Sequence, residues 1–405
     1  MSWIADPAFA PDRPFGPHTL PYGVFSAGNE GFRAIGVRVG DSVLDVSALA
    51  AAGALPYADL LSGGSLDPFL AAGRLQWTAV REALLDLVAH PTRPRDAALY
   101  PLDDVRLHLP FTVADYVDFY SSRYHAENVG RIFRPDGDPL LPNWTHLPVG
   151  YHGRAGTVVV SGTSVMRPCG QSRPTEPGAP PAFGPSARLD IEAEVGFVCG
   201  GPVRSCVPAD KVAEHVFGVV LLNDWSARDI QAWEYQPLGP FLGKSFATSV
   251  SAWITPLDAL AAARVPNPEP PHELLPYLRT AEPWGLDLSL TVEWNGTVVS
   301  RPPFRLMSFS CAQQLAHLTV NGATVRPGDL FGSGTVSGPE REQRGCFLEL
   351  SWGGREPITL DDGSARTFLE DRDTVVITAT APGPGGTLVG LGEVTGRVLP
   401  ARLPG

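Results

Sequence analysis

The stretches LDIEAEVGFV at residues 189–198 and VFGVVLLND at residues 216–224 decide the fold class of this chain. In the first stretch acidic and apolar residues alternate, so a β-strand would place Glu192 and Glu194 together on one face. The second stretch is too hydrophobic for an exposed strand and predicts a buried strand that ends at Asp224. Both patterns indicate strands rather than helices.

The remainder of the chain supports a mainly β architecture of the α+β class. There are 43 glycines and 41 prolines among 405 residues, and only 18% of the residues are charged, against about 25% in an average domain. Further short strands are predicted at residues 157–162, 288–296 and 374–380. The chain shows no regular alternation of strands with helices, which argues against a doubly wound parallel sheet.

Two domains are predicted. Residues 1–111 are expected to form a small β-barrel-like domain, from alternating apolar positions at 23–49, tight turns at 28–31 and 40–41, a helix at 75–90 and a proline-containing passage at 90–96. Residues 112–405 are denser in glycine, proline and aromatic residues. All candidates for a catalytic cluster fall in this second part.

Charge and composition exclude several classes of partner. The net charge of −12 would repel a nucleic-acid backbone, and no apolar run approaches the roughly 20 residues that span a bilayer. The first residues lack the basic and then apolar plan of a signal peptide. The five cysteines are an odd number without a CxxC pair, so reduced thiols in the cytoplasm are expected.

Three short motifs resemble known binding or catalytic motifs but lack residues that those motifs require. GPFLGKS at 239–245 lacks the glycine spacing of a phosphate-binding loop, and Pro240 removes a backbone donor. Residues 390–392 lack the third glycine of a dinucleotide fingerprint, and GSGTVSG at 332–338 is not a nucleophile elbow. These motifs support neither nucleotide binding nor a serine hydrolase.

Acidic residues in apolar surroundings predict a metal site. Asp118 lies among aromatic residues in VADYVDFY, and Asp224 ends the apolar run 216–224. Glu192 and Glu194 share one face of their predicted strand. A solvated strand face would explain the two glutamates alone. Four carboxylates in an apolar site, however, require a compensating hard cation. Oxygen ligands favour Mg²⁺, Ca²⁺ or Mn²⁺ over zinc.

A helix is predicted directly after Asp224. Ser226 has the character of an N-cap with an acid three residues on. Arg228, Gln231 and Tyr235 would then share one face, pointing towards the metal, with a solvated polar face as the alternative.

His125 is the best candidate for a general base among nine histidines. It follows Ser121 and Ser122, which would cap a helix, so it would lie in the first helical turn. There the helix dipole disfavours the imidazolium and keeps the ring neutral. His152 is the second candidate.

Four long segments closely resemble the fumarylacetoacetase family: residues 115–134, 140–163, 222–246 and 325–338. The resemblance is dense from about residue 112 onwards and thinner before it. It implies a C-terminal mixed β-roll catalytic domain, a homodimer, and the last step of tyrosine and phenylalanine catabolism. The substrate would be fumarylacetoacetate, hydrolysed to fumarate and acetoacetate.

The resemblance also implies a role for individual residues. Metal ligands would be Asp118, Glu192, Glu194 and Asp224, with Lys244 and Thr248 beside a second cation position, and Mg²⁺ or Ca²⁺ as the ion. His125 matches the general base and Glu349 the carboxylate that orients it. Arg228, Gln231 and Lys244 match groups that stabilise the oxyanion. Substrate-binding positions would be Tyr120, Arg134, Tyr151, Arg228, Gln231, Tyr235 and Thr335.

Two other functions remain open from the sequence. Related acylpyruvate hydrolases and 2-oxo acid hydratases or decarboxylases reuse the same metal cluster. A non-catalytic small-molecule-binding β protein would keep the cation for structure only. The long N-terminal part and the presence of both His125 and Glu349 favour the hydrolase.

Overall fold

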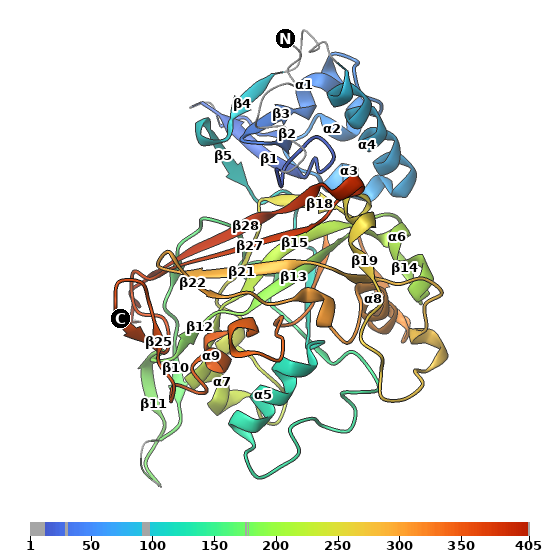
Figure 1. Ribbon diagram of the computed structural model, residues 1–405. Coiled ribbons are helices and arrows are strands. Elements are labelled where there is room, and N and C mark those ends of the chain that lie inside the picture. Colours follow the sequence, from blue (N-terminus) through green and yellow to red (C-terminus); the bar gives the residue numbers. More distant parts are fainter. Residues whose placement is uncertain (1–12, 29–30, 91–97, 175, 177, 404–405) are drawn as a thin grey trace.

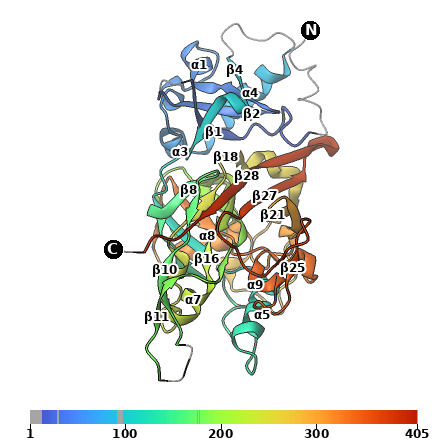
Figure 2. The same ribbon diagram turned by 90° about the vertical axis from the view of Figure 1, so that its left-hand side faces the viewer.

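The computed structural model describes residues 13–28, 31–90, 98–174, 176 and 178–403. An N-terminal unit lies at one end of a larger sheet-rich body (Figures 1 and 2). The tight turn expected at 28–31 and the proline-containing passage expected at 90–96 fall largely on positions outside the described residues.

In its described residues the N-terminal unit combines a small sheet with four α-helices. Its strands are β1 (Tyr22–Ala27), β2 (Ala34–Val39), β3 (Ser42–Asp45), β4 (Leu99–Pro101) and β5 (Val105–His108). Its helices are α1 (Val46–Ala51), α2 (Ala58–Leu61), α3 (Asp67–Ala72) and α4 (Arg74–Ala89). Helix α4 confirms the helix predicted at 75–90, and it buries Trp77, Val80 and Leu84.

This small sheet continues directly into the larger body. Within the described residues thirteen strands form one sheet, whose main path runs β4-β3-β2-β1-β18-β15-β13-β24-β6-β7. The added strands are β6 (Asp115–Phe119), β7 (Gly150–His152), β8 (Val158–Val160), β13 (Ala193–Cys199), β15 (Val216–Asp224), β17 (Thr248–Val250), β18 (Trp253–Pro256) and β24 (Asp329–Gly332). Tyr22 of β1 pairs with Ile254 of β18. The two parts therefore share backbone hydrogen bonds.

A second sheet packs against this first one. It has the order β22-β21-β27-β28-β9 and contains β9 (Val165–Met166), β21 (Ser289–Trp294), β22 (Thr297–Ser300), β27 (Thr374–Pro382) and β28 (Leu388–Leu399). In Figure 1 β27 and β28 cross the face of β15 and β18. Trp225 marks a close approach of the two layers, because a Cβ at Gly396 would lie 2.3 Å from its ring.

Paired short strands and five helices complete the larger part. The short strands are β10 (Cys169–Ser172), β11 (Ala182–Pro185), β12 (Leu189–Asp190), β14 (Arg204–Ser205), β16 (Ser226–Ala227), β19 (Arg264–Val265), β20 (Gly285–Leu286), β23 (Thr324–Val325), β25 (Ile358–Thr359) and β26 (Ala365–Arg366). The helices are α5 (Arg123–Phe133), α6 (Val212–His215), α7 (Arg228–Glu234), α8 (Cys311–Thr319) and α9 (Phe347–Leu350). Most strand pairs are antiparallel, which confirms the mixed, sheet-rich fold class.

Three further findings concern the burial of β15, the state of the cysteines and membrane-spanning helices. All nine residues of β15 are buried, as its unbroken hydrophobicity predicted. All five cysteines lie in the described part and are free thiols. Among the described residues no helix has the length and apolarity needed to cross a membrane.

Candidate active site

The four acidic residues converge where several strands end. Asp118 lies in β6, which runs parallel to β24, while Glu194 lies in β13, antiparallel to β15. Asp224 is the last residue of β15, and Glu192 immediately precedes β13. One oxygen from each of the four carboxylates lies within 4.8 Å of the others, and all four residues are buried. The sheet register thus gathers acids that are distant in the sequence.

The cluster fits a hard divalent cation. Asp118 Oδ1, Glu194 Oε1 and Asp224 Oδ1 are buried and have no hydrogen-bond partner in the protein. Orphaned carboxylate oxygens of this kind cost free energy unless a ligand satisfies them. An all-oxygen donor set suits Mg²⁺, Ca²⁺ or Mn²⁺. Gly332 is required beside them, because a Cβ there would lie 2.7 Å from Asp118 Oδ1.

Electrostatics divide the four acids into two kinds. Burial and the neighbouring carboxylates raise the pKa of Asp118 and the pKa of Glu194 well above their usual values. Burial also raises the pKa of Asp224, although the charge of Lys244 opposes this shift. Burial also opposes ionisation of Glu192, but the charges of Lys244 and Arg228 outweigh it and lower the pKa of Glu192. Glu192 is therefore already paired with cations, whereas Asp118 and Glu194 favour protons in the absence of a metal.

Two buried cations border the cluster. Lys244 Nζ lies 2.6 Å from Glu192 Oε2 and 2.7 Å from Asp224 Oδ2. Arg228 Nη1 lies 2.8 Å from Glu192 Oε1, and its Nη2 is buried without a partner. Burial alone would lower the pKa of Lys244, but Asp224 and Glu192 raise it above its usual value, so the ammonium stays charged.

His125 forms a buried pair with Glu349. As predicted, His125 lies in the first turn of α5, and Ser122 caps that helix by accepting a hydrogen bond from the His125 backbone N–H. Its Nδ1 lies 2.6 Å from Glu349 Oε2. Its Nε2 faces the carboxylate cluster, 3.9 Å from Glu192 Oε1. His152, the second candidate, is exposed on β7.

The helix after Asp224 begins later than predicted. The N-cap expected at Ser226 is wrong: Ser226 belongs to β16, its hydroxyl donates to the Asp224 carbonyl, and α7 begins at Arg228. Pairing of β16 with β12 keeps the backbone extended for two more residues. The predicted side-chain face is found in part, since Gln231 Oε1 accepts a hydrogen bond from Arg228. Tyr235 instead stacks on Phe133, with ring centroids 6.2 Å apart.

The remaining predicted residues surround the cluster at different depths. The Tyr151 hydroxyl donates to Asp224 Oδ2 at 2.9 Å and also contacts Asp118. Tyr120 packs edge-on against the His125 ring at 5.2 Å. Three further residues are placed by the backbone: Thr248 pairs with Asp224 across β17 and β15, Thr335 is buried just beyond β24, and Arg134 follows the end of α5.

The sequence analysis missed the partners of Glu349 and of Arg228. Glu349 also accepts hydrogen bonds from Asn128 Nδ2, Ser337 Oγ and Cys346 Sγ. Asp190 binds Arg228 Nε at 2.8 Å. The alternation of Asp190 with Glu192 and Glu194 could have indicated Asp190, and Cys346 lies only three residues before Glu349. Asn128 and Ser337 carry no local signal, because they come from other segments.

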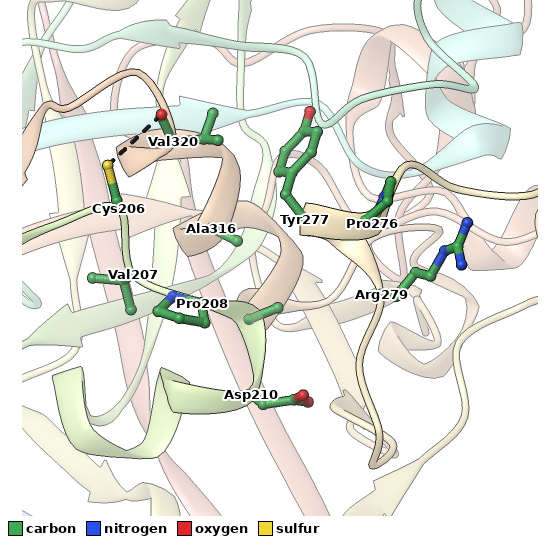
Figure 3. Close-up of a pocket in the computed structure, with 10 residues that line it drawn as sticks. Cys206, Val207, Pro208, Asp210, Pro276, Tyr277, Arg279, Ala316 and Val320 are labelled. Atoms are coloured by element: carbon green, nitrogen blue, oxygen red, sulfur yellow. Dashed lines mark hydrogen bonds between the residues drawn. The ribbon is translucent and has the colours of Figure 1, made fainter.

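A further pocket of the surface lies away from the predicted site residues. A pocket of about 310 Å³ is formed around Cys206, Asp210, Tyr277, Arg279 and Val320 (Figure 3). None of the residues predicted for the site lines it. A smaller pocket of about 150 Å³ is lined by Tyr151, His152, Arg154, Phe241, Lys244 and Ser245. Two of these residues, Tyr151 and Lys244, contact Asp224 of the cluster.

The buried carboxylate cluster is a candidate centre for a divalent metal in an enzyme of the hydrolase class. The sequence matches the family described as Fumarylacetoacetate (FAA) hydrolase C-terminal over residues 116–399, and Fumarylacetoacetase N-terminal over residues 18–110. The chain belongs to the fumarylacetoacetate hydrolase family.

Relatives of known function match the chain over nearly its whole length. Fumarylacetoacetase of Homo sapiens is 46% identical, covering 98% of both chains. Fumarylacetoacetase of Arabidopsis thaliana is 42% identical, covering 96% of this chain and 97% of that one. The similarity to these relatives therefore extends over both the N-terminal unit and the larger body of the protein.

Solved structures share the fold at low sequence identity. Fumarylacetoacetate hydrolase from psychrophilic Exiguobacterium antarcticum has a TM-score of 0.57 and 17% identity, covering 95% of this chain and 100% of that chain. Maleylpyruvate hydrolase from Sphingobium sp. SYK-6, in complex with manganese(II) and pyruvate, has a TM-score of 0.53 and 16% identity, covering 95% and 100%.

Proposed function

We propose that this protein hydrolyses the carbon–carbon bond of fumarylacetoacetate to give fumarate and acetoacetate. One observation carries the proposal: the Nε2 of His125, held through Nδ1 by Glu349, faces a buried carboxylate cluster that two cations border. Water activation, oxyanion stabilisation and a metal position thus meet in one place. The full-length similarity to fumarylacetoacetases supports the choice of substrate.

His125 acts as the general base in this proposal. Glu349 accepts a hydrogen bond from Nδ1–H, which leaves Nε2 free to take a proton from water. The hydroxide so formed adds to the substrate carbonyl. The carbon–carbon bond then breaks, its electron pair stays on the acetoacetate carbon as an enolate, and the proton that His125 took from the water is transferred to that carbon. Burial opposes ionisation of Glu349, but the positive charge that His125 carries between these steps and the hydrogen bonds from His125, Asn128 and Ser337 lower the pKa of Glu349.

Arg228, Gln231 and Lys244 would stabilise the oxyanion of the tetrahedral intermediate. Arg228 Nη2 is a buried donor without a protein partner, as expected of a group that donates a hydrogen bond to a ligand. Lys244 keeps one N–H beyond its two carboxylate partners. Gln231 binds the same guanidinium and restricts its position.

Asp118, Glu192, Glu194 and Asp224 would hold the cation, Mg²⁺ or Ca²⁺. When bound, a divalent ion there supplies Lewis-acid polarisation of the substrate oxygens. Lys244 and Thr248 would border a second cation position, since both are buried beside Asp224. The unpartnered oxygens of the cluster support this assignment.

Substrate carboxylates and oxygens would be held by Tyr120, Arg134, Tyr151, Tyr235 and Thr335. Arg134 Nε and Thr335 Oγ1 are buried without protein partners. A guanidinium can bind a carboxylate through two parallel hydrogen bonds. Tyr235 stacks on Phe133, the neighbour of Arg134, so these two substrate-binding positions lie close together.

The proposal extends to a cytoplasmic homodimer in tyrosine and phenylalanine catabolism. Five free thiols suit a reducing compartment. Leu238, Phe241 and Leu242 are 97%, 64% and 49% exposed in one loop, and a second subunit would cover such an apolar surface. Light scattering of the purified protein tests the dimer.

Turnover of authentic fumarylacetoacetate, followed by loss of its enedione absorbance, tests the activity. We expect hydrolysis of this substrate to exceed that of acylpyruvates in kcat/KM. Hydrolysis of acylpyruvates alone would assign the protein to the related hydrolases. Absence of turnover on both, with the cation still bound, would favour a binding protein.

A further inference from the structure

Asp190 lies beside the proposed site and has no role in the mechanism above. It is fully buried at the end of β12. Its carboxylate accepts hydrogen bonds from four N–H groups. Oδ1 binds the backbone N–H of Ile191 and of Phe347, both at 2.7 Å; Oδ2 binds Leu348 N at 2.9 Å and Arg228 Nε at 2.8 Å.

These contacts join two parts of the site that are otherwise separate. Phe347 and Leu348 are the first residues of α9, the short helix that carries Glu349. Arg228 is the first residue of α7 and reaches Glu192. One carboxylate therefore ties the segment that bears the partner of His125 to the guanidinium beside the metal cluster.

Three contacts of Arg228 determine the orientation of its guanidinium. Nε donates to Asp190, while Nη1 lies 2.8 Å from Glu192 Oε1 and donates to Gln231 Oε1, so the plane is fixed at two edges. Nη2 then remains as the unpartnered donor. Without Asp190 only the edge at Nη1 would be held, so the guanidinium could rotate about Nη1 and Nη2 would lose its direction.

We infer that Asp190 is a positioning residue that holds Arg228 and the Glu349 helix in a fixed mutual arrangement. The inference rests on the proposed function, because it assigns Arg228 to the oxyanion and Glu349 to the base. Asp190 does not touch the substrate in this scheme. Its effect reaches the reaction only through Arg228 and through α9.

Asp190→Asn tests the inference with little change in volume. The amide keeps one acceptor oxygen but turns an NH₂ group towards Arg228 Nε or the α9 N–H groups, so donors face donors. We expect kcat for fumarylacetoacetate to fall on the order of 10²-fold, the usual cost of a misplaced oxyanion donor. KM should change less than kcat, because the other proposed substrate-binding residues are untouched.

Asp329→Asn is the matched control. Asp329 is likewise buried, and its carboxylate accepts hydrogen bonds from Arg326 N at 2.8 Å and from Arg326 Nη2 at 3.2 Å, with no contact to α7 or α9. This variant should lower Tm and leave kcat unchanged. If Asp190→Asn behaved in the same way, Asp190 would be merely structural and the inference would fail.

A double-mutant cycle with Arg228→Lys separates action through Arg228 from a general loss of stability. A lysine keeps the charge but cannot bond Asp190 and Glu192 through a rigid plane. If Asp190 acts through Arg228, Arg228→Lys should reduce kcat much less in the Asp190→Asn background than in the wild-type protein. Additive losses would overturn the link to Arg228.

A second variant covers the case in which Asp190→Asn does not fold. Asp190→Ser removes the carboxylate without placing an amide donor against four N–H groups, and it carries the same expectation of lowered kcat at retained KM. The wild-type assay is the reference for both variants. Failure of the wild-type protein to hydrolyse fumarylacetoacetate would refute the proposed function, whereas an active wild type with an unimpaired Asp190 variant would refute only this inference.

Discussion

The Nδ1 atom of His125 lies 2.6 Å from Oε2 of Glu349, although 224 positions separate the two residues in the sequence. Both side chains are buried, at 3% and 0% exposure. The contact joins the first turn of α5 to α9, and it determines which ring nitrogen of His125 is free to accept a proton.

His125→Ala should reduce kcat by at least about 10²-fold, the lower end of the usual contribution of a general base. Metal affinity should remain, because His125 lies outside the group of four carboxylates. Glu349→Gln should reduce kcat less severely, since the base is kept but loses its orienting charge. Steady-state kinetics with calorimetric metal titration measures both. A near-normal kcat for His125→Ala would require a different base.

Lys244→Arg should lose on the order of 10²-fold in kcat while the protein folds and binds metal. Lys244 Nζ fits between Glu192 and Asp224 at 2.6 and 2.7 Å, a space that suits a compact ammonium rather than a planar fork. Basic residues number 31, of which only Lys211 and Lys244 are lysines, so arginine serves at almost every other basic position.

Lys211→Arg is the control for the preceding substitution. Lys211 is an exposed residue that pairs with Glu214 at 2.7 Å on the surface. An arginine can make the same contact, so kcat and Tm should stay unchanged. Equal activity of the two variants would show that the lysine at position 244 has no special role.

Chelation should abolish activity, and Mg²⁺ or Ca²⁺ should restore it. Without the ion, burial and like charges raise the pKa of Asp118 and of Glu194 well above the usual range. The folded apoprotein then binds protons more tightly than the unfolded chain, so its stability decreases as pH rises through the raised pKa values. A bound cation removes this penalty.

Two measurements check this pH dependence. Metal affinity should weaken on acidification, and calorimetry in buffers of different ionisation enthalpy should detect protons released on metal binding. As pH rises above the usual titration range of carboxylates, the Tm of the chelated protein should fall more steeply than that of the loaded protein. Metal binding without proton release would contradict the raised pKa values.

Gly332→Ala should weaken metal binding about 10- to 100-fold, as substitutions next to metal ligands do. A Cβ at this position would lie 2.7 Å from Asp118 Oδ1 and 2.9 Å from Glu194 Oε2, so both carboxylates would have to move. Gly156→Ala serves as the control, because a Cβ at Gly156 meets no atom within 4 Å. Unchanged metal affinity in Gly332→Ala would place the ion away from these two oxygens.

The sequence by itself determined the features that depend on local pattern. The uninterrupted apolar run before Asp224 indicated a buried strand, and Ser122 indicated the start of the helix that carries His125. The spacing of apolar residues and the capping of helices depend on residues that are close in the sequence. Both can therefore be recognised before the tertiary structure is known. The resemblance to a known family added the candidate roles of residues such as Glu349.

Only the tertiary structure decided which distant residues meet. Asp190 contacts both Arg228 and the N–H groups of α9, and β1 pairs with β18 so that the N-terminal sheet joins the larger one. Because β16 pairs with β12, α7 begins at Arg228 and not directly after Ser226 as the sequence predicted. Strand register and the approach of helices to sheets depend on the packing of the whole chain, so the local sequence does not identify which distant segments these residues will contact.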